Sequence, residues 1–229
     1  MLAPKVIYED NHLLVIDKPV GLTTQGALPG EPSAVEWARD YVKRKYAKPG
    51  NVFIGVVSRL DRDVSGVLVL ARTSKGAARL NEQFRERTIK KTYWAGVEGT
   101  PPETGRCTDL LVEDVELGRM TVVDPQLSAG FRAADAQTAT LSWRTLSKNG
   151  AATLLEVELE TGRKHQIRVQ LASRGWPIIG DRKYGSRRRF ERGIALHARR
   201  LELKHPTRDE QLTFEAECPA AWDALGLRI

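Results

Sequence analysis

The sequence predicts an α+β fold in which a large, mixed but mostly antiparallel sheet is flanked by helices. Two observations support this class. Short runs of Val, Ile and Leu recur along the chain and are separated mainly by short polar turns, not by helical crossovers. Only a few segments place apolar residues at helical spacing. With 229 residues the chain can bury a sizeable core, and we expect a single domain over 1–229.

In the first part of the chain, two apolar runs flank a polar turn at 9–11, which predicts a hairpin over 6–16. Ser33 is a candidate N-cap for a helix that runs to about Tyr46, because apolar residues there recur every three or four positions. The apolar run 52–57 is expected to be a strand that enters a charged segment.

A second apolar run, 67–70, is expected to be the strand that leaves the charged segment. Thr73 or Ser74 would then cap a helix. Further strands are predicted near three ranges, namely 89–97, 138–146 and 153–159. The segment 101–105 contains two prolines and a glycine, so we expect it to be a surface loop.

Composition restricts the possible functions. Lys plus Arg number 36 against 29 for Asp plus Glu, and this net charge of +7 favours a polyanionic partner. Cys107 and Cys218 form no CxxC motif, so we expect a reducing, cytoplasmic setting. The four histidines lack metal-ligand spacing, and no signal peptide or membrane-length apolar run is present. We therefore expect no metal, no cofactor and no membrane association.

The most unusual segment is 58–66, in which arginines and aspartates alternate directly before the apolar run 67–71. Charges beside a dry core are costly unless they are paired, and such arrangements are common at catalytic sites. Asp61 is therefore our first candidate for a catalytic residue. A solvated turn is the competing interpretation. A calcium loop starting at Asp61 is excluded, because its twelfth position, where a Glu is required, is Arg72.

Four other segments carry clustered basic residues. Lys91 and Tyr93 share one face of a predicted strand, where an aromatic ring beside a cation suits base stacking, although ordinary strand packing is the alternative. Lys164, His165 and Arg168 would crowd one side of a predicted helix, either for an anionic partner or as a solvated face. The clusters 43–45 and 186–192 would suit phosphate contacts, with a solvated charge run as the alternative, which applies more to 43–45 than to 186–192.

Taken together, these residues resemble the RluA-type family of RNA pseudouridine synthases. The resemblance spans roughly 5–217. It rests on segments similar to the family's opening motif and to its HRLDxxTSG, KxYxA, TGRxHQIR, GDxxYG and LHA…HP motifs, which are 15–22, 58–66, 91–95, 161–168, 180–185 and 196–206. Ser58, Val64 and Gln170 depart from the family pattern, and none of them is a residue that carries the chemistry.

The resemblance implies a pseudouridine synthase fold without an S4 domain, and an RNA isomerase. Asp61 would start glycosidic cleavage of a flipped uridine, by attack on the ribose C1′, by attack on the base C6 or by removing a proton. Tyr93 would stack on the base, Arg168 would pair with Asp61, Arg59 would fill the space that the base vacates, and Ile167 would line the pocket.

The implied substrate is structured RNA, with ribosomal RNA favoured over tRNA, and no protein partner or oligomer beyond a monomer is implied. A non-catalytic RNA-binding or RNA-chaperone protein on the same scaffold is the alternative. The presence of Asp61, Tyr93 and Arg168 together favours the enzyme. A DNA-binding protein is a third interpretation, but no groove-reading motif supports it.

Overall fold

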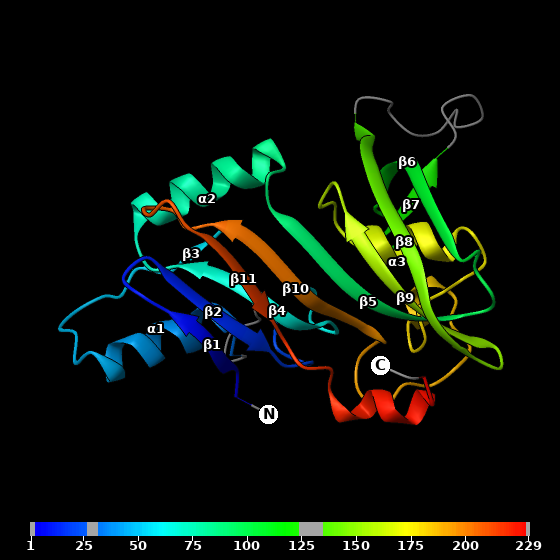
Figure 1. The fold of residues 1–229 in the computed structure, drawn as a ribbon, viewed down its shortest axis with the longest axis horizontal. Coiled ribbons are helices and arrows are strands. Elements are labelled where there is room, and N and C mark those ends of the chain that lie inside the picture. Colours follow the sequence, from blue (N-terminus) through cyan, green and yellow to red (C-terminus); the bar gives the residue numbers. More distant parts are fainter. Residues whose placement is uncertain (1–2, 27–31, 124–134, 228–229) are drawn as a thin grey trace. The chain divides into compact units, whose positions relative to one another are not determined.

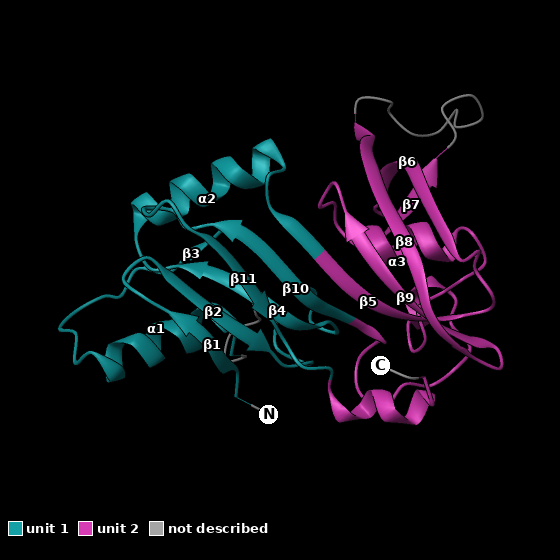
Figure 2. Ribbon diagram, in the orientation of Figure 1, with its two compact units in different colours: residues 1–91, 197–218 teal, residues 92–196, 219–229 magenta. Residues whose placement is uncertain are grey.

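The computed structural model describes residues 3–26, 32–123 and 135–227. Its chain divides into two compact units, each discontinuous in sequence (Figure 2). Unit 1 comprises 1–91 and 197–218, and unit 2 comprises 92–196 and 219–229. The expectation of a single domain over 1–229 remains a prediction, and each unit is described by itself.

The sheet of unit 1 follows the order β1-β2-β4-β10, with β3 paired to β4 and β11 paired to β10 (Figure 1). Its strands are β1 (Lys5–Glu9), β2 (Leu13–Lys18), β3 (Gly55–Val56), β4 (Ser65–Ala71), β10 (Leu196–Lys204) and β11 (Gln211–Glu215). Within this unit, β4 and β10 pair in parallel and the other described pairs are antiparallel. Every residue of β4 is buried, which explains its continuous apolar sequence.

Two helices of unit 1 begin at capped N-termini. Helix α1 (Ala34–Lys45) begins after Ser33, whose side chain accepts from the amide of Glu36 while the Glu36 side chain accepts from the amide of Ser33. Helix α2 (Ser74–Glu86) begins after Thr73, which caps the amide of Gly76.

Unit 2 is built on an antiparallel sheet of order β5-β9-β8-β6-β7. Its strands are β5 (Lys90–Glu98), β6 (Thr104–Asp114), β7 (Arg119–Val123), β8 (Gln137–Asn149) and β9 (Ala152–Leu159). Helix α3 (Gln166–Ala172) follows β9, and two 3₁₀ turns, η2 (Arg182–Tyr184) and η3 (Ala220–Leu225), follow later. Val169 of α3 and Tyr184 pack in a core cluster with residues of the three strands β6, β7 and β8.

The α+β class is confirmed, as are the predicted hairpin, both N-caps of unit 1 and the three later strands. The strand expected over 52–57 is wrong in length, because only Gly55–Val56 pairs with β4 and Phe53 is half exposed. The loop expected at 101–105 is also shorter, because β6 already begins at Thr104. In the described part of the chain no helix is long and apolar enough to span a membrane.

Candidate active site

Asp61 lies in a turn that connects β3 to β4, and the segment 18–24 fixes the backbone on both sides of it. The Thr24 hydroxyl donates to the carbonyl of Leu60 at 2.8 Å and accepts from the amide of Leu60 at 3.0 Å. The amide of Gly21 donates to the carbonyl of Arg62 at 2.8 Å. The residues before and after Asp61 are therefore both anchored to the same segment.

Lys18 places a buried ammonium group near this turn. Its Nζ donates to the carbonyls of Pro19 and Leu22 at 2.9 and 2.8 Å, and the residue has no exposed surface. Burial lowers the pKa of Lys18 to about 8, while Asp61 and Asp63 act in the opposite direction. Lys18 and Asp61 are thus close enough to interact electrostatically.

The end of the turn is held by β10. The Nε2 of His197 faces the carbonyl of Ala216 at 3.2 Å, so this nitrogen carries the hydrogen and Nδ1 accepts from the Ser65 hydroxyl at 2.8 Å. Burial lowers the pKa of His197 to about 4, which keeps the imidazole neutral. Gly66 has a φ of +112°, and a Cβ there would lie 2.3 Å from the carbonyl oxygen of Ala198. Only glycine allows this close approach.

In unit 2, Arg168 is fixed by a bidentate ion pair with Asp181. Its Nε and Nη2 donate to the two carboxylate oxygens at 2.7 and 2.9 Å. Both side chains are almost fully buried. The guanidinium carbon also lies 5.1 Å from the centroid of the Tyr184 ring, a cation–π distance. Arg168 is therefore held in one orientation before any substrate arrives.

Helix α3 begins later than the sequence suggests. His165 has a left-handed backbone with φ of 52°, so Lys164 and His165 precede the helix and do not share a helical side with Arg168. The physical reason is the Gln166 side chain, whose oxygen accepts from the Thr161 hydroxyl and the Arg163 amide and closes a tight turn. The His165 imidazole bonds to the Tyr184 hydroxyl at 2.8 Å, and Lys164 pairs with Glu113.

The five predicted site residues are divided between the units. Asp61, half-buried, and Arg59, exposed, lie in unit 1. Tyr93, half-buried on β5, and the buried Ile167 and Arg168 of α3 lie in unit 2. The structure thus brings Ile167 and Arg168 together on one helix. The pairing of Arg168 with Asp61 stays a prediction.

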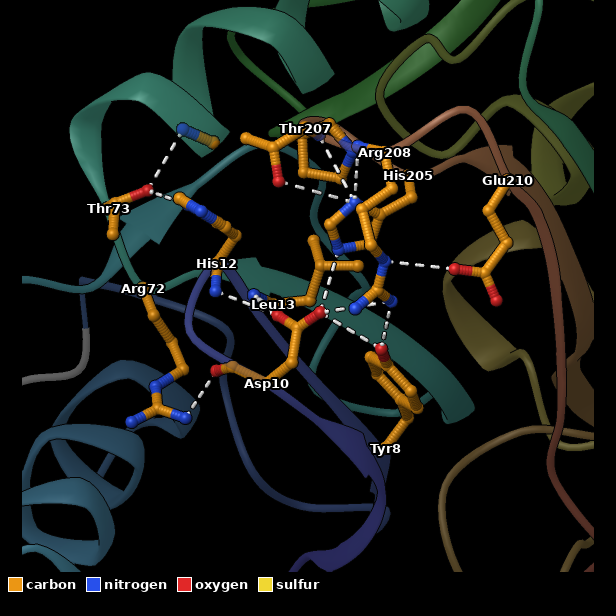
Figure 3. Close-up of polar contacts among 12 residues, drawn as sticks. Tyr8, Asp10, His12, Leu13, Arg72, Thr73, His205, Thr207, Arg208 and Glu210 are labelled. Atoms are coloured by element: carbon orange, nitrogen blue, oxygen red, sulfur yellow. Dashed lines mark hydrogen bonds and ion pairs between the residues drawn. The ribbon is translucent and has the colours of Figure 1, made fainter.

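His205, from the segment that resembles the LHA…HP motif, lies in a separate polar cluster at the tip of the β1–β2 hairpin (Figure 3). Its Nδ1 accepts from the amides of Thr207 and Arg208, so Nε2 carries the hydrogen and donates to Asp10 at 2.7 Å. Burial acts to raise the pKa of Asp10, but hydrogen bonds from the His12 and Leu13 amides and from His205 lower it to about 2. This cluster joins the hairpin to the loop after β10.

Comparison with known proteins is decisive. The family model for RNA pseudouridylate synthase matches residues 12–173. The chain belongs to the RluA-type family of RNA pseudouridine synthases. Members of this family are isomerases, and the predicted pseudouridine synthase fold is confirmed.

Two bacterial proteins and one human structure illustrate the relationship. An uncharacterized RNA pseudouridine synthase of Bacillus subtilis is 35% identical over 94% of this chain and 68% of its own length. Ribosomal large subunit pseudouridine synthase D of Nitrosomonas europaea is 35% identical over 96% of this chain and 64% of its own length. The structure of human RNA pseudouridylate synthase domain containing 4 is 27% identical, with a TM-score of 0.79 over 98% of this chain and 94% of that one.

Three residues of this synthase acquire roles that the sequence alone did not assign. Lys18 and Asp181 lie in the family-like segments 15–22 and 180–185, but their burial and partners are visible only in three dimensions. A lysine at the end of a strand, two positions after the apolar run 13–16, was the available signal for Lys18. Thr24 gives no such signal, because its two bonds to Leu60 join positions 36 residues apart.

Proposed function

We propose that this synthase converts a uridine of structured RNA to pseudouridine, with ribosomal RNA as the favoured substrate and tRNA as the second. The relative from Nitrosomonas europaea is named as a ribosomal large subunit enzyme, which supports ribosomal RNA. The formal net charge of +7 agrees with a polyanionic substrate. We also propose that the chain acts in the cytoplasm as a monomer, without a cofactor or a protein partner.

In the proposed reaction the target uridine first leaves its base stack, which costs a few kcal/mol. Arg59 occupies the vacated space, while Tyr93 stacks on the flipped base and Ile167 lines the pocket. The bond between ribose C1′ and uracil N1 then breaks, and a bond between C1′ and C5 forms. N1 gains a hydrogen and C5 loses one, so the product is an isomer of the substrate.

Asp61 is the residue that starts glycosidic cleavage in this proposal, and Arg168 pairs with it. The observation that carries the assignment is the anchoring of Leu60 and Arg62 to the segment 18–24. A carboxylate between two fixed backbone positions meets the need of a nucleophile or base for a defined geometry. The buried ammonium of Lys18 interacts electrostatically with this carboxylate.

The test is Asp61→Asn, which is nearly isosteric but cannot act as a nucleophile or base. Tritium release from RNA that contains 5-tritiated uridine reports the exchange at C5. We expect the variant to bind RNA with wild-type affinity and to release no tritium above background. Asp63→Asn is the matched control, since it removes a carboxylate from the same turn, and it should stay substantially active. Retention of more than about a tenth of the wild-type turnover by Asp61→Asn would overturn the assignment.

A further inference from the structure

The segment Gly180–Gly193, here called the basic loop, carries six basic residues and two acidic ones. The basic residues are all exposed: Arg182, Lys183, Arg187, Arg188, Arg189 and Arg192. Among the residues that the structure describes, none of the six forms an ion pair. One of the two acidic residues, Asp181, is buried against Arg168. The loop therefore presents a concentrated positive charge to solvent.

A loop with this much like charge repels itself and should be extended and mobile in isolation. Here three anchors of unit 2 hold it. Asp181 binds Arg168, the ring of Phe190 packs edge-on against Trp222 with centroids 6.0 Å apart, and Ser186 binds Glu98 of β5. The loop also closes tightly, because a Cβ on Gly180 would lie 2.7 Å from the Cβ of Phe190.

Glu98 is the anchor that acts on the arginines themselves. One of its carboxylate oxygens accepts three hydrogen bonds: from the Ser186 hydroxyl at 2.5 Å, from the Arg187 amide at 2.9 Å and from the Arg188 amide at 3.0 Å. The Ser186 oxygen in turn accepts from the Gly180 amide at 3.0 Å. A single carboxylate thus fixes the backbone of two consecutive arginines, whose side chains remain exposed.

A carboxylate beside a basic surface is unfavourable for binding a polyanion by charge alone. The presence of Glu98 is explained if its ordering of the loop favours RNA binding more than its negative charge opposes it. Immobilising side chains and loops at an interface costs free energy, and a loop that is ordered in advance avoids part of that cost.

We propose that the basic loop is a docking surface for the phosphate backbone of the RNA substrate and that Glu98 is the residue that shapes it. The inference rests on the proposed RNA substrate and adds the surface that holds it. Phosphate is the matching chemistry, because several exposed guanidiniums at fixed spacing can each donate to phosphate oxygens. Glu98 is a positioning residue in this proposal and does not touch the RNA.

The proposal is tested by whether removal of the Glu98 carboxylate weakens or strengthens RNA binding. Glu98→Ala and Glu191→Ala each remove one negative charge from this surface, but the structure gives Glu191 no hydrogen bond to the loop backbone. Affinity is measured by fluorescence anisotropy with a labelled hairpin transcript that has uridines in its loop, over a salt series. We expect Glu191→Ala to bind slightly more tightly than wild type. Glu98→Ala should bind about five- to tenfold more weakly, since the loop must then be ordered on binding.

Glu98→Gln separates charge from order, because it keeps an acceptor oxygen while losing the charge. It should bind at least as tightly as wild type. Equal tightening by Glu98→Ala, Glu98→Gln and Glu191→Ala would overturn the proposal, because Glu98 would then act only as a charge. If Glu98→Ala does not fold, hydrogen exchange at the Arg187 and Arg188 amides of the wild type decides, and exchange as fast as in an open loop would also overturn it.

A triple variant with Arg187, Arg188 and Arg189 changed to Ala identifies the partner. It should weaken RNA binding and flatten the salt dependence by roughly 0.7 to 0.9 per lost phosphate contact. An unchanged slope of log affinity against log salt concentration would overturn the assignment of RNA to this loop. Binding of the wild-type protein to phosphatidylserine vesicles but not to the transcript would overturn it as well. Failure of the proposed function would give a different result. The variants would then show the expected differences in RNA affinity, but the wild type would release no tritium from the bound transcript.

Discussion

Arg168 and Asp181 form a buried ion pair in which two parallel hydrogen bonds of 2.7 and 2.9 Å join the guanidinium to the carboxylate. The same arginine is the proposed partner of Asp61, so its position is determined by a contact that does not itself perform chemistry. Folding and catalysis can therefore be separated by substitution at these two positions.

Removing one member of the buried pair should destabilise the protein strongly, because it leaves an uncompensated buried charge. We expect Asp181→Leu to lower the free energy of unfolding by about 3 kcal/mol. Adding Arg168→Met should recover most of that loss, while the double variant stays inactive. Urea denaturation and the tritium-release assay measure the two effects. If the losses in free energy of unfolding of the two single variants add up in the double variant, Arg168 and Asp181 do not stabilise the protein as a pair.

Arg168→Met alone tests the predicted pairing with Asp61. A carboxylate that loses a neighbouring cation holds its proton more tightly, so the acid limb of the pH–rate profile should move to higher pH. The profile is measured under single-turnover conditions at saturating RNA. A slower variant whose acid limb stays in place would argue that Arg168 acts elsewhere in the site.

Thr24→Val should slow the bound complex by removing both hydrogen bonds to Leu60. We expect a loss of about 10- to 100-fold in the single-turnover rate, because small displacements of a catalytic group are costly. Thr24→Ser keeps the hydroxyl and should restore most of the rate. Thr153→Val is the matched control: it removes a fully buried hydroxyl that donates to the Gly99 carbonyl at 2.8 Å, far from the Asp61 turn in sequence.

The two threonine variants are compared in both stability and single-turnover rate. Thr24→Val and Thr153→Val should each cost free energy of unfolding on the order of 1–3 kcal/mol, since each removes a side-chain hydrogen bond to the backbone of a distant segment. Only Thr24→Val should lower the rate. Equal effects of the two variants on the rate would mean that Thr24 contributes stability alone.

Lys18 predicts a specific pH dependence of stability. Burial lowers its pKa from the ordinary value of 10.5 to about 8, so between these values the unfolded chain binds more protons than the folded one. The free energy of unfolding of the wild type, measured relative to Lys18→Met, should therefore rise as the pH increases from 8 to 10.5. The rise should total about 3 kcal/mol. If the difference in free energy of unfolding between the wild type and Lys18→Met stays constant from pH 8 to 10.5, the lowered pKa of Lys18 is contradicted.

Arg59→Ala should affect the bound complex more than affinity, because its proposed role begins after the base has flipped. We expect a lower single-turnover rate at saturating RNA and only a small change in Kd. The triple arginine variant of the basic loop is the comparison, and it should lower affinity while leaving the bound rate nearly unchanged. The reverse pattern would exchange the two assignments.

Local patterns in the sequence predicted much of the fold but little of the support of the site. The caps at Ser33 and Thr73 and the buried strand β4 follow from neighbouring residues, so they were readable. Strands β6, β7, β10 and β11 were missed, and in β10 and β11 the interspersed charged residues give a weak apolar pattern. The left-handed backbone at His165 depends on the side chain of Gln166, a contact that the spacing of apolar residues does not reveal.

The candidate site shows the same division. Asp61 was proposed from the charged segment around it, and the roles of Tyr93 and Arg168 were proposed from the resemblance. Their supports Thr24, Lys18 and Asp181 are defined by partners that are distant in sequence, as in the bond of Thr24 to Leu60. Long-range pairing of this kind leaves no periodic signal in one sequence.

The discontinuity of unit 1 has a consequence for biosynthesis. Strand β4, which follows the Asp61 turn, acquires its parallel neighbour only when residues 197 and 198 are available, and unit 1 extends to residue 218. A chain emerging from the ribosome therefore carries the Asp61 turn long before the strand that fastens its end has been translated. Since domains generally fold as units, the nascent protein cannot complete this unit until residue 218 has been translated.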